Sequence, residues 1–154
     1  MKGYKSLLII LIILATSCNK SPEKMEREYF SSAIKQVKVN NDCQWIVVLP
    51  GLGCHGCIQE AEYFMKEHIA DERILFILTK ISSLKILQQK TEILFSEHSN
   101  VYIDRDNLFD ISTDNSIYPC IIQLKGGEIL KHSFQSPSNA AFHQMEQELA
   151  GKTQ

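Results

Sequence analysis

The stretch VVLPGLGCHGC, from Val47 to Cys57, constrains the fold of this chain more than any other feature. A short apolar, β-branched run ends at Pro50, whose ring nitrogen cannot donate a hydrogen bond to a sheet ladder. Gly51 and Gly53 follow, and glycine tolerates the backbone angles that a sharp reversal needs. The pattern therefore predicts a buried strand that ends near the proline and turns abruptly into the next element.

Cys54 and Cys57 lie where that next element begins. Residues 58–68 have helical apolar periodicity, so we expect the two cysteines in the first turn of a helix. Unpaired backbone N–H groups and the positive end of the helix dipole favour a thiolate there and lower its pKa. We expect Cys54 to be the attacking thiol and Cys57, further inside the helix, to be the resolving thiol. His55 would stabilise the thiolate if protonated, or is simply an exposed residue, and Gly56 would keep the approach to Cys54 open.

The rest of the chain alternates predicted strands and helices. The strands span residues 44–49, 73–79, 101–103, 117–124 and 128–134. The helices span residues 24–39, 58–68, 82–96 and 137–149, with a short helical turn at 107–112. The third of these helices can break near Thr91, Ser136 or Ser138 would cap the last one, and Gly126-Gly127 predicts a tight hairpin turn. This order predicts an α/β fold with a central mixed β-sheet and helices on both faces.

The first residues are typical of an export signal. Lys2 and Lys5 precede an apolar run over residues 7–15, which is too short to span a bilayer because that takes about 20 apolar residues. Small residues then lead to Cys18, an order that resembles the lipobox of bacterial lipoproteins. The similarity implies that the leader is cut away and that lipidated Cys18 anchors the protein to a membrane. The alternatives are an ordinary signal peptide, or a short apolar anchor, with an incidental cysteine.

Length and charge limit the remaining possibilities. The chain has 154 residues and a net charge of −2, and its scattered Lys and Arg residues argue against a nucleic-acid partner. We expect a lipoprotein signal peptide at 1–17, a lipidated tether and N-terminal helix at 18–41, one folded domain at 42–150 and a frayed tail at 151–154. After export, the cysteines would meet an oxidising compartment in which disulfides persist.

Three features in this order resemble the thioredoxin superfamily: GCHGC after an apolar strand, then IYP, then the hairpin CIIQLKGGEILKHSF before a final helix. The similarity covers residues 44–149 and is greatest to its membrane-tethered, extracytoplasmic thiol-disulfide oxidoreductases, the TlpA/ResA-like group. It implies a thioredoxin-like fold, a redox-active disulfide between Cys54 and Cys57, and no cofactor. It also implies that Pro119 follows a cis peptide bond, faces the cysteine motif and, with Tyr118 before it, helps to hold substrate backbone.

The same resemblance implies where the protein works and with what. It would be lipid-anchored in the cell envelope and would face the periplasm or the exterior. Its partners would be protein thiols and disulfides and a membrane electron donor or acceptor. Whether it reduces, oxidises or isomerises disulfides is open.

The sequence departs from the family pattern around the motif. Gly53 replaces the usual aromatic residue, and Gly56 replaces the usual proline. Many relatives also bury a carboxylate in the strand before the motif, whereas residues 45–49 are wholly apolar. Glu60 and Glu62 are candidates for proton exchange with the second cysteine, although plain exposed helix positions are the simpler interpretation.

Other functions compete with disulfide exchange. A C-x-x-C pair can be half of a zinc site that Cys43 and Cys120 would complete, but Cys43 enters its strand about 20 Å from the motif end. We therefore expect both cysteines to be buried apolar residues. Copper delivery would combine the cysteine pair with a distant histidine, for which His132 is the candidate, although a strand residue that points to solvent is the simpler interpretation. A peroxidase is disfavoured because the peroxiredoxin pattern, a proline and a threonine or serine spaced before the cysteine, is absent from this sequence. The remaining alternative is a binding module that does not depend on thiol chemistry.

Overall fold

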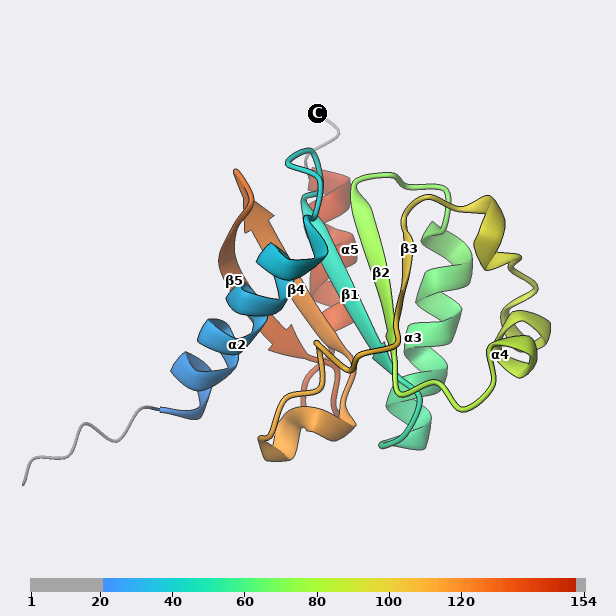
Figure 1. Cartoon of the computed structure of the whole chain (residues 1–154), viewed down its shortest axis with the longest axis horizontal. Coiled ribbons are helices and arrows are strands. Elements are labelled where there is room, and N and C mark those ends of the chain that lie inside the picture. Colours follow the sequence, from blue (N-terminus) through green and yellow to red (C-terminus); the bar gives the residue numbers. More distant parts are fainter. Residues whose placement is uncertain (1–20, 152–154) are drawn as a thin grey trace, which may run out of the picture.

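A five-stranded mixed sheet with four α-helices makes up the computed structural model, which describes residues 21–151 (Figure 1). The strands are β1 (Trp45–Pro50), β2 (Ile74–Thr79), β3 (Val101–Asp104), β4 (Cys120–Lys125) and β5 (Glu128–Phe134). The helices are α2 (Pro22–Val37), α3 (His55–His68), α4 (Leu84–Thr91) and α5 (Ala141–Gly151), with 3₁₀ turns η1 (Phe95–Glu97) and η2 (Asp114–Ile117). The predicted signal peptide at 1–17 and the predicted lipidation site Cys18 lie outside the described residues.

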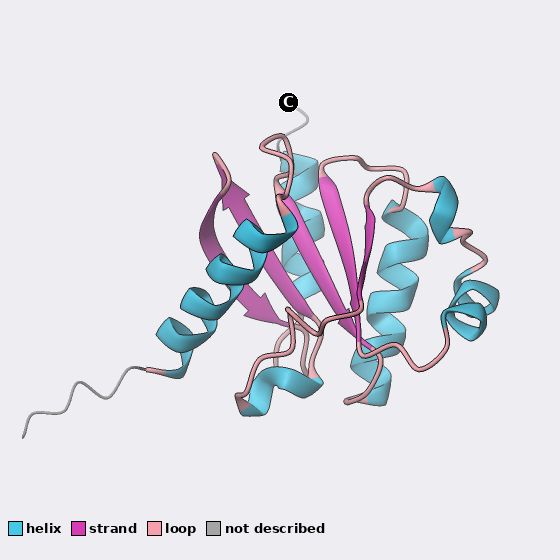
Figure 2. Cartoon of the chain, viewed as in Figure 1, coloured by secondary structure: helices cyan, strands magenta, loops and turns pink. Residues whose placement is uncertain are grey.

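The strand order is β3-β2-β1-β4-β5, so β1 runs through the centre of the sheet (Figure 2). β1, β2 and β3 are parallel, while β4 is antiparallel to β1 and β5 is antiparallel to β4. Gly126 and Gly127, with φ of 60° and 79°, close the β4–β5 hairpin as predicted. The mixed α/β sheet predicted from the strand and helix alternation is confirmed. The cysteine pair follows the carboxyl end of β1, the edge at which such sheets usually bind ligands.

The two faces of β1 belong to two separate hydrophobic cores. Trp45, Val47 and Leu49 pack with buried side chains of α3, α4 and α5, whereas Ile46 and Val48 pack with buried side chains of α2. All six residues of β1 are buried because helices cover both faces. Figure 1 shows α2 in front of the sheet and α5 behind it. The predicted covering of both faces by helices is therefore confirmed.

Helix α2 is fixed to the antiparallel side of the sheet. Ser21 caps its first turn by accepting from the Lys24 amide, and Phe30, 1% exposed, packs into the core between α2 and the sheet. Burying a side chain of this size contributes about 1.5–3 kcal/mol. The Arg27 guanidinium donates to the carbonyl oxygens of Ile129 and Leu130 on β5. The helix thus satisfies polar backbone groups of an edge strand, which would otherwise be open to pairing with another chain.

Two segments differ from the predicted helices. The predicted helix over 82–96 ends at Thr91, the break considered above, because Glu92 is left-handed with φ of 60° and a separate 3₁₀ turn follows. Residues 107–112 form turns, not a short helix. The 3₁₀ turn lies further on, at Asp114–Ile117, so the strand predicted to begin at 117 begins at Cys120.

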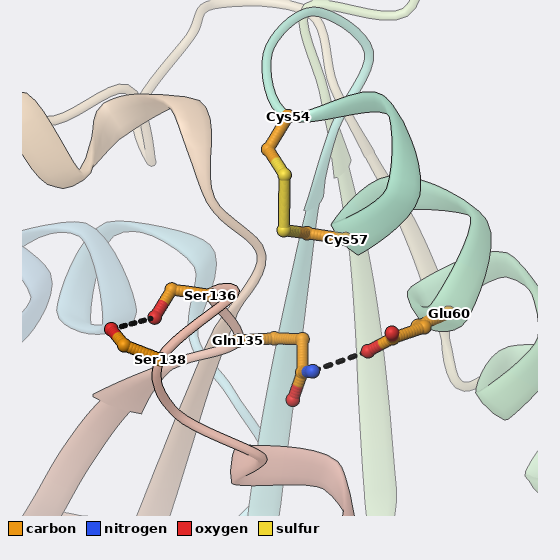
Figure 3. Close-up of a disulfide and its surroundings, with 6 residues drawn as sticks. All are labelled: Cys54, Cys57, Glu60, Gln135, Ser136 and Ser138. Carbon is orange, nitrogen blue, oxygen red and sulfur yellow. Dashed lines mark hydrogen bonds between the residues drawn. A yellow bond between two sulfur atoms is a disulfide. The ribbon is translucent and has the colours of Figure 1, made fainter.

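The last helix begins four residues later than the predicted range of 137–149. Ser136 and Asn139 pair as an isolated bridge, and the Ser136 and Ser138 hydroxyls lie 3.2 Å apart instead of capping a helix (Figure 3). The cap comes from Gln135, whose side-chain oxygen accepts from the Phe142 amide at 3.1 Å. Capping by a side chain seven residues away has no short-range sequence signature.

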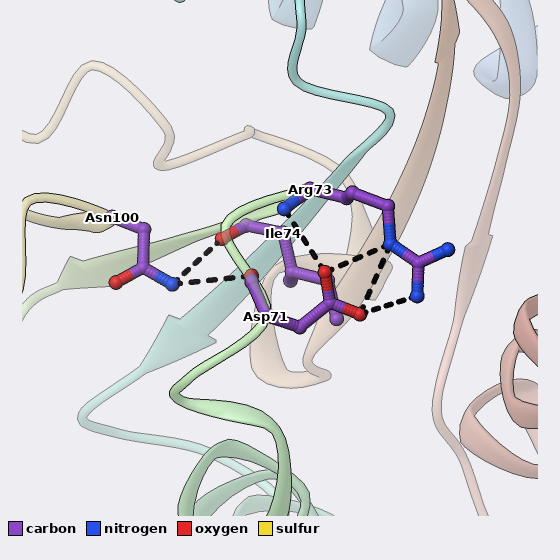
Figure 4. Close-up of polar contacts among 4 residues, drawn as sticks. All are labelled: Asp71, Arg73, Ile74 and Asn100. Atoms are coloured by element: carbon purple, nitrogen blue, oxygen red, sulfur yellow. Dashed lines mark hydrogen bonds and ion pairs between the residues drawn. The ribbon is translucent and has the colours of Figure 1, made fainter.

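The edge opposite the cysteine pair carries a compact polar cluster (Figure 4). Asn100 donates to the carbonyl oxygens of Ile69, Asp71 and Ile74, and so closes the turn that leads into β2. The Asp71 carboxylate accepts from the Arg73 backbone amide at 3.0 Å and from its guanidinium at 2.7 to 3.2 Å. The Arg73 hydrogen bond, which outweighs the opposing effect of burial, lowers the pKa of Asp71.

Within residues 21–151, no helix is both long enough and apolar enough to cross a membrane.

We predict that Asp71→Asn lowers the free energy of unfolding at neutral pH by about 1 kcal/mol or less, because Arg73 is 41% exposed and solvent screens the pair. Since the folded-state pKa of Asp71 is lowered, its stabilisation is complete above the pH at which an unfolded aspartate ionises, about pH 4. It is lost as the pH falls through the folded-state pKa. Denaturant unfolding from pH 7 down to the acid transition measures the difference.

Asp106→Asn is the matched control, since Asp106 is exposed and makes no hydrogen bond or ion pair to any of the described residues. A deficit in Asp71→Asn that stays unchanged as the pH falls from 7 to the acid transition would contradict the prediction.

Candidate functional site

Two glycines shape the turn between β1 and α3. A Cβ atom on Gly51 would overlap the backbone carbonyl of Lys80, and one on Gly53 would overlap the carbonyl oxygen of Ile117. Gly53 also has a φ of 146°, which side chains rarely adopt. The turn therefore needs glycine for both close approach and backbone angle, as the sequence indicated for its sharpness.

Cys54 and Cys57 form a disulfide with a Cα–Cα distance of 5.3 Å (Figure 3). Cys54 is the N-cap residue of α3, a position at which serine, threonine or aspartate oxygens usually accept hydrogen bonds from first-turn amides. The first turn of α3 contains no acidic residue. When the disulfide is reduced, a Cys54 thiolate would therefore meet N–H groups and the positive end of the helix dipole, both of which interact favourably with a negative charge.

The two sulfur-bearing residues differ in exposure. Cys57 is 5% exposed and belongs to the buried face of α3, whereas Cys54 is half-buried at the start of the helix. His55 and Gly56 are both exposed in the first turn. A Cβ atom on Gly56 would meet no atom within 4 Å apart from its chain neighbours and the backbone of its own helix, so the space at this position is open.

The loop before β4 lies directly against the motif. The Cys54 amide donates to the Ile117 carbonyl oxygen at 2.9 Å, so this loop holds the backbone of the first cysteine. Tyr118 follows in an extended conformation and is half-buried, and Pro119 is buried. Ile117 itself is 44% exposed, and Leu52 in the preceding turn is 64% exposed. Exposed apolar side chains therefore lie in both segments that meet at Cys54.

The peptide bond before Pro119 is trans, since the described residues contain no cis peptide bond. The cis bond that the family resemblance implies is therefore wrong for this structure. Tyr118 has φ of −109° and ψ of 143°, the extended geometry that sterics favour before any proline. The Pro119 carbonyl accepts from the Gln135 amide at 2.9 Å. This bond extends the hydrogen bonding between β4 and β5 to the end of the loop that precedes β4.

Gln135 connects three elements below the disulfide (Figure 3). Its backbone pairs with Pro119, its side-chain oxygen caps α5, and its amide nitrogen donates to Glu60 on α3. It is 6% exposed, so all these polar groups are satisfied by protein contacts. Sequence reasoning missed Gln135, because nothing local marks a glutamine that follows a strand as buried.

The two glutamates proposed for proton exchange have partners of their own. Glu60 is exposed and accepts from Gln135, while Glu62 pairs with Lys90 of α4 at 2.6 Å. Glu60 is therefore an exposed helix residue, as the simpler interpretation has it, but with one hydrogen bond, whereas Glu62 is half-buried. Glu60 and Gln135 meet below the disulfide (Figure 3), whereas the Glu62–Lys90 ion pair joins α3 to α4.

The other two described cysteines are buried free thiols, as expected. Burial raises the pKa of Cys43, whose thiol donates to the Trp45 carbonyl at 3.1 Å. Burial, reinforced by the negative charge of Glu26, raises the pKa of Cys120 well above that of an ordinary thiol. Both are held as neutral thiols, which are poor nucleophiles.

His132 does not point to solvent, so the simpler interpretation of this residue is wrong. Its side chain is 4% exposed, and its Nε2 atom lies 3.1 Å from Glu26 Oε2. It packs against the rings of Phe30 and Phe134. Within residues 21–151, no three His, Cys, Asp or Glu side chains gather closely enough to hold a metal ion.

Glu26 is the second buried polar residue that sequence reasoning missed, although a signal existed. Glu26, Phe30, Ala33 and Val37 follow one another at helical spacing, so the carboxylate lies on the same stripe as the residues that α2 buries. Its position on that stripe indicates burial even though its charge argues for exposure.

Comparison of this chain with protein-family models, with curated proteins and with solved structures gave no match.

The glycines on the two sides of Cys54 provide a matched pair of variants. We predict that Gly53→Ala lowers the free energy of unfolding by about 2 kcal/mol or more, because it combines a strained φ with overlap on Ile117. Gly56→Ala should raise it by up to about 1 kcal/mol, since the added methyl group meets open space and alanine favours the helix. Denaturant unfolding of the oxidised proteins measures both, and equal effects of the two substitutions would contradict this account of the turn.

Proposed function

We propose that this protein is a thioredoxin-like thiol-disulfide oxidoreductase that acts on protein disulfides outside the cytoplasm. The observation that carries the proposal is the Cys54–Cys57 pair, held at disulfide distance where β1 passes into α3. The mixed sheet and the loop against the motif are compatible with a thioredoxin-like arrangement. The trans bond before Pro119 is one feature in which this chain departs from it, beside Gly53 and Gly56 in the motif.

In the reducing direction, the reduced pair would begin with the Cys54 thiolate. This sulfur attacks a substrate disulfide, forms a mixed disulfide with one substrate sulfur and releases the other as a thiolate. The Cys57 thiolate then attacks Cys54 Sγ, which releases the second substrate thiol and leaves the Cys54–Cys57 disulfide. Two electrons move from the pair to the substrate, and a dithiol donor must return them. The same steps in reverse oxidise a substrate dithiol.

The exposures support this division of roles. A half-buried sulfur at the helix start can be approached by a substrate, while the buried sulfur of Cys57 reaches only Cys54. Cys43 and Cys120 have raised pKa values and are buried, so neither competes as a nucleophile.

A polypeptide substrate is supported by the surroundings of Cys54. Leu52 and Ile117 are exposed apolar side chains in the two segments that flank it, a composition suited to contact with another chain. Tyr118 is extended, as a residue that pairs with a substrate backbone would be. The open space at Gly56 gives a bulky substrate room to approach.

The sequence features at the N-terminus complete the proposal. A lipid on Cys18 would place α2 and the sheet close to a membrane of the cell envelope, facing the periplasm or the exterior. A membrane-bound dithiol donor would then be the source of electrons. The copper alternative gains no support, because His132, its proposed third ligand, is buried against Glu26.

We predict that Cys57→Ala traps mixed disulfides on Cys54, because no sulfur remains to displace the substrate. Cells expressing the full chain are quenched with acid and a thiol-blocking reagent, and the adducts are separated without reductant and identified by mass spectrometry. Cys57→Ala should carry at least about tenfold more adduct than the wild type. Cys54→Ala is the control and should carry none, since Cys57 is buried.

Equal adduct levels in both variants would contradict the assigned roles. Absence of adducts in Cys57→Ala, with one equivalent of copper in protein purified without added metal, would favour metal delivery. A double cysteine variant that keeps every phenotype of the wild type would favour a binding module.

A further inference from the structure

A buried carboxylate on α2 reaches a loop that is distant in sequence. Glu26 is 3% exposed, and its Oε1 atom accepts from Thr113 Oγ1 at 2.6 Å and from Asn115 Nδ2 at 2.9 Å. Both partners belong to the η2 segment, residues 113–117, which leads to the cysteine motif. Burial raises the pKa of Glu26, but hydrogen bonds from Thr113, His132 and Asn115 together outweigh burial and lower it.

The other carboxylate oxygen is held by the sheet. Glu26 Oε2 lies 3.1 Å from His132 Nε2 on β5, and the imidazole ring is enclosed by Phe30 and Phe134. Glu26 therefore links an edge strand of the sheet to the η2 segment. Removing it would leave half-buried Thr113 and Asn115 and the buried His132 side chain without this partner, which is costly.

The η2 segment is in direct contact with the backbone of Cys54. The Ser116 amide donates to the Thr113 carbonyl, and the Tyr118 amide donates to the Asn115 carbonyl, both at 3.0 Å, so the segment moves as one turn. At its end, the Ile117 carbonyl accepts from the Cys54 amide. Since even a Cβ atom on Gly53 would overlap Ile117, no free space separates this turn from the motif.

We propose that Glu26 is a positioning residue of the redox site, which sets the reactivity of the Cys54–Cys57 pair by holding the η2 segment against Cys54. The inference rests on the proposed disulfide-exchange function and adds a regulator to that site. It also couples the cysteines to helix α2, the described element that is nearest in sequence to the predicted lipidation site Cys18. Glu26 acts through Thr113, Asn115 and Ile117 and does not touch the sulfur atoms.

The test compares substitutions at Glu26 with a control on the same helix. Glu26→Ala removes the acceptor, Glu26→Gln keeps one side-chain oxygen for Thr113 and Asn115, and Glu23→Ala removes an exposed carboxylate of the first turn of α2. Two readouts need no substrate: the rate at which iodoacetamide alkylates Cys54 in the reduced protein, resolved by peptide mass, and the equilibrium of the Cys54–Cys57 disulfide with glutathione. Thermal unfolding of each variant reports its stability separately.

We expect Glu26→Ala to slow alkylation of Cys54 by about tenfold and to shift the glutathione equilibrium by a similar factor, because misplacing a reacting group is costly. Glu26→Gln should stay within about twofold of the wild type, and Glu23→Ala should not differ from it. Unchanged reactivity in a folded Glu26→Ala protein would overturn the proposal. Equal defects in Glu26→Gln and Glu26→Ala would overturn it as well, because they would indicate a charge effect in place of positioning.

A second variant covers the case in which Glu26→Ala does not fold. Thr113→Val removes one hydrogen bond to Glu26 from the loop side at nearly constant volume, and we expect it to slow Cys54 alkylation by about threefold. No effect in this folded variant would overturn the proposal. The measurements also separate the two claims. Trapped mixed disulfides, with no change of Cys54 alkylation in the Glu26 or Thr113 variants, would contradict the positioning role alone. Slower Cys54 alkylation in Glu26→Ala, without trapped mixed disulfides in Cys57→Ala, would contradict the proposed function alone.

Discussion

The contact between the Cys54 amide and the Ile117 carbonyl is the interaction on which the site depends. It joins the end of a central parallel strand to a loop about sixty residues further along the chain. The contact is possible because position 53 has no side chain and adopts a backbone angle that other residues avoid. One consequence is that the N-cap of α3, where the first sulfur lies, is fixed by tertiary structure as well as by the helix.

Polar groups inside the fold support this contact from two sides. Gln135 joins the Pro119 carbonyl, α5 and α3 on one side of the sheet, and Glu26 joins β5 to the η2 segment on the other. Both side chains are more than nine-tenths buried, and each makes at least two hydrogen bonds that satisfy its polar atoms. Buried networks that are fully satisfied favour one arrangement, because any displacement leaves a polar group unpaired. The sulfur pair is thereby held beyond the carboxyl end of β1 by a small number of directional bonds.

Local patterns predicted the parts of the structure that local physics decides. The apolar run before Pro50, the glycine turn, the helix after it and the Gly126-Gly127 hairpin all follow from short-range preferences, and β1, α3 and the β4–β5 hairpin appear as predicted. The start of α5 and the burial of His132 depend on partners far away in the sequence, so no local pattern contained them. Glu26 was the exception, since its place on the buried stripe of α2 was visible in the spacing. The trans bond before Pro119 is the locally favoured state, and only the family resemblance implied a cis bond.

The pH dependence of iodoacetamide alkylation in the reduced protein, followed separately at each of the two motif sulfurs, tests the central claim most directly. If the turn holds the first sulfur among unpaired helix amides, Cys54 should be alkylated at a lower pH than a free cysteine, while Cys57 should react far more slowly. Both sulfurs titrating together like free cysteine, or a reduced pair that fails to close intramolecularly on mild oxidation, would contradict the account.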